Sequence, residues 1–333
     1  MIRKRTSTIT LCFLAIGLLA GGVSGHAAAP GQSLNFATNP AGNENYTIAV
    51  SQGQLISKKT NIQVIVQPTQ GPKVLPSLME SNDAQLSNLS SMGTYWALTG
   101  TGEYDKPFKF IRVLQSGNDK CFGFITREKS GIKKISDLKG KKITYIFTSL
   151  LTKEVAEMEL QAFGLNPAKD VTMLKAEDGS RALQDLGQGR TDAVSATLGG
   201  SKMAELASKT KIVVLPFPAD KVPFLQKRLP AMLPALTPNN LTGIDPGVPM
   251  VASTMLFIGR ADLGEDAVYT MVKALIENYN ELKVINPVLA DWKPEVAVQE
   301  VPVPYHPGAI KYYREKGLWS SKMDQLQQTL IGR

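Results

Sequence analysis

Three hydroxyl side chains surround the predicted start of a helix in the middle of the chain. Thr148, Ser149 and Thr152 flank Leu150, where a segment with helical spacing begins and runs to about residue 163. A helix N-terminus has unpaired backbone N–H groups and the positive end of the helix dipole, and both favour a negatively charged group. We therefore predict that these three residues bind an anion, with Leu150 adding apolar bulk beside it.

Polar residues also follow the first predicted strand, residues 34–38. Asn39, Asn43 and Tyr46 lie in the loop and first helical turn after it. An amide and a tyrosine there suit the polar head of a small ligand. An ordinary helix cap is the alternative, since Asn is a favoured capping residue.

The third predicted strand, residues 85–90, ends in the same way. Ser90, Ser91 and Tyr95 follow it and would present hydroxyls at the same edge of a sheet. We include all three as ligand-binding candidates, although capping of the next helix explains Ser91 equally well.

Arg181 and Gly199 complete the set of candidates. Arg181 lies at the start of a predicted helix and could form a bidentate salt bridge with a carboxylate. It could equally pair with Asp178 or Asp185 nearby. Gly199 precedes Gly200, and two glycines after a strand permit close approach of the backbone to a ligand, or form a plain turn.

Catalytic and metal-binding arrangements are missing from the sequence. It has no Gly-x-Ser-x-Gly elbow, phosphate-binding Walker loop, HExxH, CxxC or GxGxxG after a strand. Its two histidines are His26 and His306, and Pro307 makes His306 a predicted helix cap. Cys121 lies in an apolar strand, which indicates a core residue. We expect no catalytic residues, no metal and no cofactor.

Short β-rich runs alternate with helical patterns along the chain, which predicts an α/β fold. About 300 residues fit two lobes better than one. The predicted crossings are at residues 117–119, between two strands, and 246–249. Lobe one is then 28–120 plus 253–333, and lobe two is 121–252, each a mixed sheet flanked by helices. Ligands bind outside the carboxyl ends of strands in such sheets, so we expect the site between the lobes. The predicted strands are 34–38, 62–67, 85–90, 110–115, 121–127, 142–147, 171–175, 193–196, 212–215 and 251–258.

The N-terminus has the pattern of an export signal. Arg3, Lys4 and Arg5 precede an apolar stretch at residues 11–20, and small residues follow as far as residue 29. This stretch is shorter than the roughly 20 residues that span a bilayer. We predict a cleaved signal peptide at residues 1–27 and a periplasmic protein.

The formal net charge is +8, from 37 basic and 29 acidic residues. The basic residues are spread out and are not interleaved with aromatic ones, so we expect no nucleic-acid partner. A modest positive field would attract organic anions, although solubility alone also explains the balance.

Residues 302–317, PVPYHPGAIKYYREKG, and residues 131–147, GIKKISDLKGKKITYIF, carry a family resemblance. With them, the chain resembles the TAXI branch of the TRAP-transporter solute receptors over nearly all of its mature length. The resemblance implies the type II periplasmic-binding fold, in which two lobes joined by two hinge strands close on a ligand. It also implies an integral-membrane TRAP permease, driven by an ion gradient, as partner. A monomer is the default state for a receptor that docks on a permease.

The chain departs from this family where polar ligand contacts are expected. Pro72 and Leu75 stand where the family has Ser and Asn, and Leu241 stands where it has a tyrosine. The implied ligand is therefore a small organic anion, most simply a carboxylate, that is larger or less polar than glutamate.

Three other functions stay open from the sequence. A receptor for an ABC or tricarboxylate-type transporter has the same architecture, and the two quoted segments are what argue against it. A periplasmic enzyme on this scaffold would need a reactive group in the cleft. A surface or adhesion protein is suggested by export alone.

Overall fold

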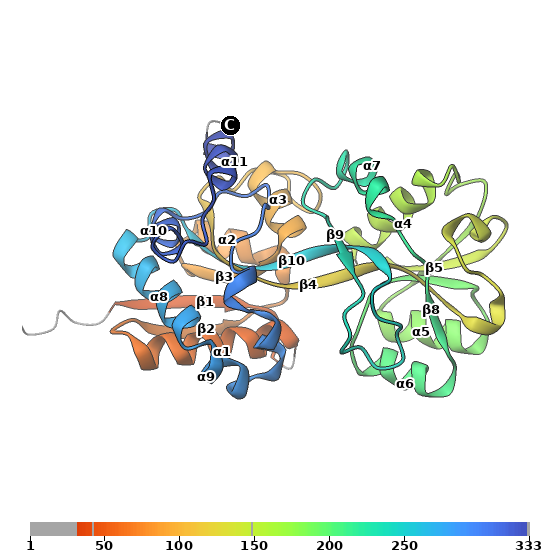
Figure 1. The fold of residues 1–333 in the computed structure, drawn as a ribbon, viewed down its shortest axis with the longest axis horizontal. Helices are drawn as coiled ribbons and strands as arrows, with labels where there is room; N and C mark the ends of the chain where they lie inside the picture. Colours follow the sequence, from red (N-terminus) through yellow and green to blue (C-terminus); the bar gives the residue numbers. More distant parts are fainter. Residues whose placement is uncertain (1–31, 42, 148, 332–333) are drawn as a thin grey trace, which may run out of the picture. The chain divides into compact units, whose positions relative to one another are not determined.

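The computed structural model describes residues 32–41, 43–147 and 149–331 (Figure 1). The predicted signal peptide and Thr148 lie outside these residues. The described helices and strands form one compact unit from Gln32 onward. Its strands form a ten-stranded sheet in the order β2-β1-β3-β10-β4-β7-β5-β6, with β8 paired to β4 and β9 paired to β10.

Lobe one is the part of the sheet in which β1 lies between β2 and β3, paired in parallel with both. Its strands are β1 (Ser33–Thr38), β2 (Gln63–Pro68) and β3 (Leu86–Ser90). Its helices are α1 (Glu44–Lys59), α2 (Leu75–Glu80), α3 (Ser91–Thr99), α8 (Glu265–Glu277), α9 (Tyr279–Ile285), α10 (Pro307–Glu315) and α11 (Ser321–Ile331).

Lobe two is the part in which β5 lies between β6 and β7, again in parallel. Its strands are β5 (Lys142–Ile146), β6 (Thr172–Ala176), β7 (Ala193–Thr197) and β8 (Ile212–Val214). Its helices are α4 (Leu150–Ala162), α5 (Gly179–Gln188), α6 (Ser201–Lys209) and α7 (Val222–Gln226). The predicted α/β fold with two mixed-sheet lobes is confirmed.

Two long antiparallel strands, β4 (Ile111–Arg127) and β10 (Pro249–Arg260), join the lobes (Figure 1). In lobe one β10 pairs with β3, and in lobe two β4 pairs with β7 and β8. The pairing of β10 with β4 shifts register between Thr254 and Leu256. Bulges of this kind bend a strand locally, so this point suits a hinge. The lobe boundaries 28–120 with 253–333 and 121–252 remain our proposal.

The prediction of two strands separated by a turn at residues 117–119 is wrong, because β4 is continuous there. Gly, Asn and Asp are typical turn residues, but here tertiary contacts keep the chain extended. The ring of Trp292 covers Gly117, and its Nε1 donates to Asn118 Oδ1 at 2.9 Å. Asp119 accepts a hydrogen bond from Thr254 Oγ1 at 2.6 Å across the two joining strands.

Strand β9 (Leu233–Leu236) was not predicted. It contains Pro234, which cannot donate to a ladder and argues against a strand in sequence. Among the described strands it pairs with β10 alone, as an edge strand in which a proline is tolerated.

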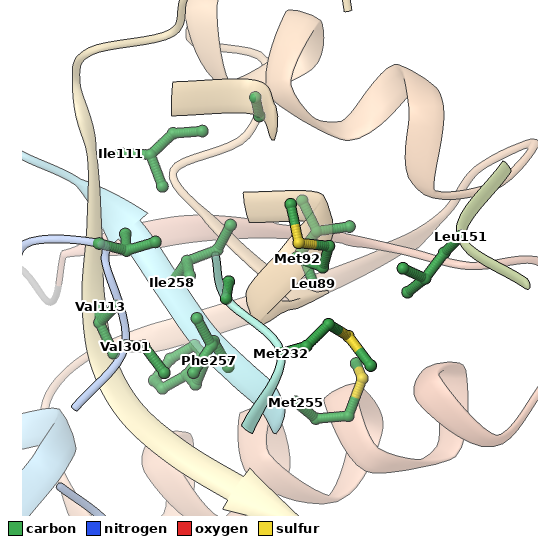
Figure 2. Packing of buried hydrophobic residues seen from close by; sticks show 14 of the residues in the cluster. Leu89, Met92, Ile111, Val113, Leu151, Met232, Met255, Phe257, Ile258 and Val301 are labelled. Atoms are coloured by element: carbon green, nitrogen blue, oxygen red, sulfur yellow. The ribbon is translucent and has the colours of Figure 1, made fainter. Parts of the chain in front are cut away.

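A hydrophobic cluster extends from lobe one into lobe two (Figure 2). Leu89 and Met92 contribute from β3 and α3, Met255 from β10, Met232 from the segment before β9, and Leu151 from α4. The three methionines are 0% to 4% exposed. Unbranched methionine side chains adapt to irregular spaces, so this contact between the lobes can rearrange at moderate cost.

Close packing in lobe one explains the residue types of the segment His306-Pro307-Gly308-Ala309. The N-cap of α10 is His306, whose Nδ1 accepts the N–H of Gly308 at 3.1 Å and whose Nε2 lies 3.1 Å from the Leu263 carbonyl oxygen. Gly308 faces the backbone of Glu265 in α8, where a Cβ atom would lie 2.2 Å from the carbonyl oxygen. The predicted capping role of His306 is confirmed, and burial lowers its pKa.

Within the described ranges, no helix has the length and apolar character needed to span a membrane.

Candidate functional site

The predicted site residues lie at the carboxyl ends of strands in both lobes. In lobe one, β1 leads to α1 with Asn43 as the N-cap, and β3 leads to α3 with Ser90 as the N-cap. In lobe two, β5 leads to α4 with Ser149 as the N-cap, and β7 leads to α6 with Gly200 as the N-cap. Parallel strands bring these turns to one edge of each lobe, where such sheets bind ligands.

Asn39 and Asn43 contact each other in the turn before α1. Asn39 Nδ2 donates to Asn43 Oδ1 at 3.3 Å, and Asn43 Oδ1 also accepts the N–H of Asn45 at 2.9 Å. Asn39 is 8% exposed, whereas Asn43 is exposed and Tyr46 half-buried. The turn thus combines a helix cap with a buried amide.

Ser90 and Tyr95 are half-buried at the start of α3, but Ser91 is fully buried. The Ser91 hydroxyl donates to the Ala231 carbonyl oxygen at 2.9 Å and accepts the N–H of Thr254 at 3.1 Å. It also lies 3.1 Å from Ser253 Oγ. This hydroxyl has no capacity left for a ligand in this conformation. We therefore assign Ser91 to the packing of α3 against β10 and leave it out of the proposed site.

The start of α4 keeps part of the predicted anion-binding character. Ser149 Oγ accepts the N–H of Thr152 at 3.4 Å, and both Ser149 and Leu150 are half-buried. Thr152 is 2% exposed, and its hydroxyl bonds to the backbone carbonyl oxygens of Ser149 and Ile146. Thr152 therefore supports the turn, while Ser149 and Leu150 stay half-buried, with Leu150 packed against the hydrophobic cluster.

A carboxylate from lobe one already contacts this helix start. The carboxylate of Glu103, in the loop after α3, lies near the backbone N–H of Leu150. Burial raises the pKa of Glu103, while the Lys73 ammonium and the Leu150 N–H act in the opposite direction. Sequence reasoning missed Glu103 because nothing local to residue 103 connects it with residue 150.

A second charged contact lies where β4 passes the start of α1. Lys120 on β4 forms an ion pair with Glu44, the first residue of α1. Their side chains are 25% and 43% exposed. Lys120 was also missed, since the sequence places it between two predicted strands and nothing near it points to Glu44.

Arg181 and Gly199 differ in their surroundings. Arg181 Nε lies 3.3 Å from Asp185 Oδ2, and the Arg181 N–H donates to the Asp178 side chain that caps α5. Its guanidinium is thus paired within lobe two, the alternative raised by the sequence. Gly199 has a φ of +109° and lines a pocket of about 250 Å³ with Gly200, Leu241 and other residues.

In residues 32–41, 43–147 and 149–331, no group of three or more His, Cys, Asp or Glu side chains is placed to hold a metal ion. Burial raises the pKa of the Cys121 thiol to about 11, so this thiol is a poor nucleophile.

The fold is that of a type II periplasmic solute-binding protein. One similar structure is a putative sulfonate-binding protein SsuA from Methylobacillus flagellatus KT, with a TM-score of 0.53 and 13% identity over 91% of this chain and 94% of that one. Another is the aliphatic sulphonate-binding protein SsuA from Escherichia coli, with a TM-score of 0.50 and 14% identity over 91% and 99%. A TctC solute-binding protein from Polaromonas has a TM-score of 0.52 and 11% identity over 79% and 88%.

The family follows from the sequence match. Residues 36–317 match the NMT1-like family, and this chain belongs to it. The match covers both joining strands, begins within β1 and ends before α11.

Proposed function

We propose that this protein is a periplasmic receptor of a TRAP-type secondary transporter, of the TAXI branch, and not an enzyme. It binds a small organic anion between its lobes and delivers it to an integral-membrane permease. The ligand is a carboxylate that is larger or less polar than glutamate. The observation that carries the proposal is the start of α4, where the half-buried Ser149 caps the helix and the backbone N–H of Leu150 lies near the carboxylate of Glu103 from lobe one.

This contact supports an anion site because a protein carboxylate already lies beside these backbone N–H groups. The N–H groups at the start of a 13-residue helix favour negative charge. Burial of Glu103 works against its ionised form. A ligand carboxylate with better access to Leu150 and Ser149 would therefore compete with Glu103 for the same donors.

In this proposal, the two lobes close on the ligand by bending of the joining strands β4 and β10. A ligand that contacts both lobes stabilises the closed form over the open one, and the permease recognises that form. The shift in register of β10 near Thr254 and the methionine-rich contact between the lobes both suit a hinge that closes by small rearrangements.

Receptors for sulfonate and tricarboxylate-type transport have the same fold, so the fold does not choose between transporter classes. The segments 131–147 and 302–317 favour the TRAP class through the resemblance described above. A neighbouring reading frame for a large polytopic membrane protein would support it, and an adjacent ATPase gene would instead favour an ABC system.

Thermal unfolding of residues 28–333 with a panel of carboxylates and sulfonates tests receptor function. A ligand at 100 times its dissociation constant adds about 2.7 kcal/mol of stability. We expect a large shift with one class of carboxylate and no chemical conversion of it. Chemical conversion of any compound would contradict the proposal that the protein is not an enzyme. A rise in unfolding temperature with sulfonates alone would contradict the proposal that the ligand is a carboxylate.

The Ser149→Ala variant is expected to bind the carboxylate about tenfold or more weakly, since hydrogen bonds to charged groups contribute roughly 1.5–3 kcal/mol. It also loses the cap of α4, which lowers the free energy of unfolding by about 1 kcal/mol. Isothermal titration calorimetry measures the affinity.

Asp178→Ala is the matched control for this effect, because it removes the cap of α5 in the same lobe. We expect a similar loss of stability without the loss of affinity. Equal affinities of wild type and Ser149→Ala would contradict the anion site at α4.

A further inference from the structure

We propose that Phe147 is a binding residue and that the ligand carries an aromatic ring, which packs against the Phe147 ring while the ligand carboxylate lies at the start of α4. This inference rests on the proposed receptor function and narrows its ligand to an aryl or arylalkyl carboxylate. Sequence reasoning placed Phe147 at the end of a strand and did not select it as a candidate. In the structure it follows β5 directly, two positions before Ser149.

The backbone places Phe147 in the same turn as the proposed anion site. The N–H of Ser149 donates to the Ile146 carbonyl oxygen at 3.1 Å, which closes a four-residue turn with Phe147 as its second residue. The N–H of Phe147 donates to the carbonyl oxygen of Ala176, the last residue of β6, at 3.0 Å. Two residues of chain span at most about 7 Å, so the Cα atoms of Phe147 and Ser149 lie within that distance. Covalent geometry and these two hydrogen bonds therefore hold Phe147 beside the start of α4.

The side chain of Phe147 is more accessible than any other aromatic side chain that the structure describes. It is 50% exposed, whereas every other phenylalanine, tyrosine and tryptophan in the described ranges is buried or half-buried. Single exposed apolar residues are common on protein surfaces, so exposure alone would carry no conclusion. Phe147 differs because its backbone is held at the edge of the sheet where ligands bind in this kind of fold. A ring in water at that edge gains free energy when a ligand covers it.

The groups around the turn favour a ligand ring over another part of the protein as the partner of Phe147. Leu150 already packs against the hydrophobic cluster. From lobe one, the Glu103 carboxylate lies near the start of α4, and the Lys73 ammonium acts on it. The face of an aromatic ring is negative, so a carboxylate is a poor partner for it. A ligand whose carboxylate replaces Glu103 at the helix start would instead bring its own carbon skeleton alongside Phe147.

The short distance between Phe147 and Ser149 also limits the length of the ligand. Paired aromatic rings have their centroids about 4.5–7 Å apart. A ring packed on Phe147 and a carboxylate at Ser149 are therefore joined by few atoms, as in benzoates, arylacetates and 3-arylpropanoates. These acids are less polar than glutamate, as the proposed function requires.

Matched acids test the inference by isothermal titration calorimetry on residues 28–333. One pair is 3-phenylpropanoate and 3-cyclohexylpropanoate, which share a carbon skeleton but differ in the π-system. Phenylacetate and benzoate are compared with their cyclohexyl counterparts in the same way. In a pair that binds, we expect the aromatic acid to bind about threefold to tenfold tighter, because two aromatic rings attract each other beyond the effect of their buried area.

The Phe147→Leu variant removes the ring and keeps a large apolar side chain. We expect the ratio of affinities within a pair to fall to about 1 in this variant, and Phe147→Tyr to retain the wild-type preference, because tyrosine keeps the ring. Phe163→Leu is the control, since Phe163 lies at the far end of α4, whose 13 residues span about 20 Å. It should keep the wild-type ratio. Thermal unfolding without ligand confirms that the three variants fold.

The outcomes separate the ring contact from the receptor function. A wild-type protein that binds aromatic and cyclohexyl acids equally, or that binds non-aromatic carboxylates alone, overturns the inference and leaves the receptor in place. A preference that survives in Phe147→Leu overturns the assignment to Phe147. Equal loss of affinity for both acids of a pair would mean that lobe one, and not the ligand, covers Phe147 on closure. Binding of no carboxylate, together with no shift in the wider panel, overturns both proposals.

Discussion

The Glu159→Gln variant is expected to be more stable than the wild type at pH 8 and to lose much of the pH dependence of stability. Glu159 lies on α4, is 1% exposed, and neither carboxyl oxygen has a hydrogen-bond partner in the described part of the chain. The carboxyl group packs beside Gly123 of β4, where a larger residue would take its space. Burial raises the pKa of Glu159 well above 4.5.

The sign follows from proton binding. The folded protein holds the proton of Glu159 over a pH range in which the unfolded chain has released it, so the folded state binds more protons. Stability therefore falls as the pH rises from the unfolded pKa, near 4.5, toward the raised folded pKa. The slope is up to about 1.4 kcal/mol per pH unit. Gln cannot ionise, so the variant avoids this loss.

Urea unfolding at pH 5, 6, 7 and 8 measures the effect as a difference between variant and wild type. The control is Glu154→Gln on the same helix, where the carboxylate accepts from Arg228 Nη2 at 2.6 Å. Removing that ion pair should destabilise the protein by about 1 kcal/mol at pH 7. If the free energies of unfolding of wild type and Glu159→Gln change in parallel across this pH range, Glu159 is not protonated in the folded state as argued above.

The Gly308→Ala variant is expected to lose about 3 kcal/mol or more of unfolding free energy. The added Cβ would lie 2.2 Å from the Glu265 carbonyl oxygen and 3.0 Å from the Tyr269 nitrogen. Both contacts are backbone atoms of α8, which cannot rotate away, so α10 and α8 must separate. Overpacking of a core costs roughly 1–3 kcal/mol even where side chains can adjust.

Gly264→Ala provides the matched control next to the same helix. Gly264 is the N-cap of α8 with a φ of −60°, and no atom lies within 4 Å of an added Cβ. We expect a loss of about 0.5–1 kcal/mol there, because alanine is a poorer helix cap than glycine, with no added steric cost. Chemical denaturation of both variants gives the comparison, and similar losses would mean that helix contact does not explain Gly308.

The local patterns of the chain were sufficient for much of the fold. Alternation of strands and helices gave the α/β class. The helix predicted at residues 150–163 is α4, Leu150–Ala162. Pro307 correctly placed the start of α10, with His306 as its cap. These features depend on side-chain spacing and on backbone preferences within a few residues, and both can be read from the sequence.

Contacts between distant segments could not be read in this way. Turn residues at 117–119 lie in a continuous strand because Trp292 and Thr254 bind them. Ser91 was predicted to offer its hydroxyl to a ligand, but this hydroxyl donates to the Ala231 carbonyl oxygen and accepts the N–H of Thr254. The carboxylate of Glu103 lies near the Leu150 backbone N–H, and Lys120 forms an ion pair with Glu44. Both contacts join residues that are far apart in sequence.

The sequence by itself therefore determined the class of fold, the starts of α4 and α10, and the candidate residues that follow the strand ends. Tertiary structure alone decided which of those polar groups stay available, because a hydroxyl or amide has a fixed number of hydrogen bonds and distant parts of the chain compete for them. Ser91 is fully used in this way, whereas Asn39 keeps an acceptor without a partner among the described residues. Folding thus converts a set of candidate residues into a smaller set that can still bind a ligand.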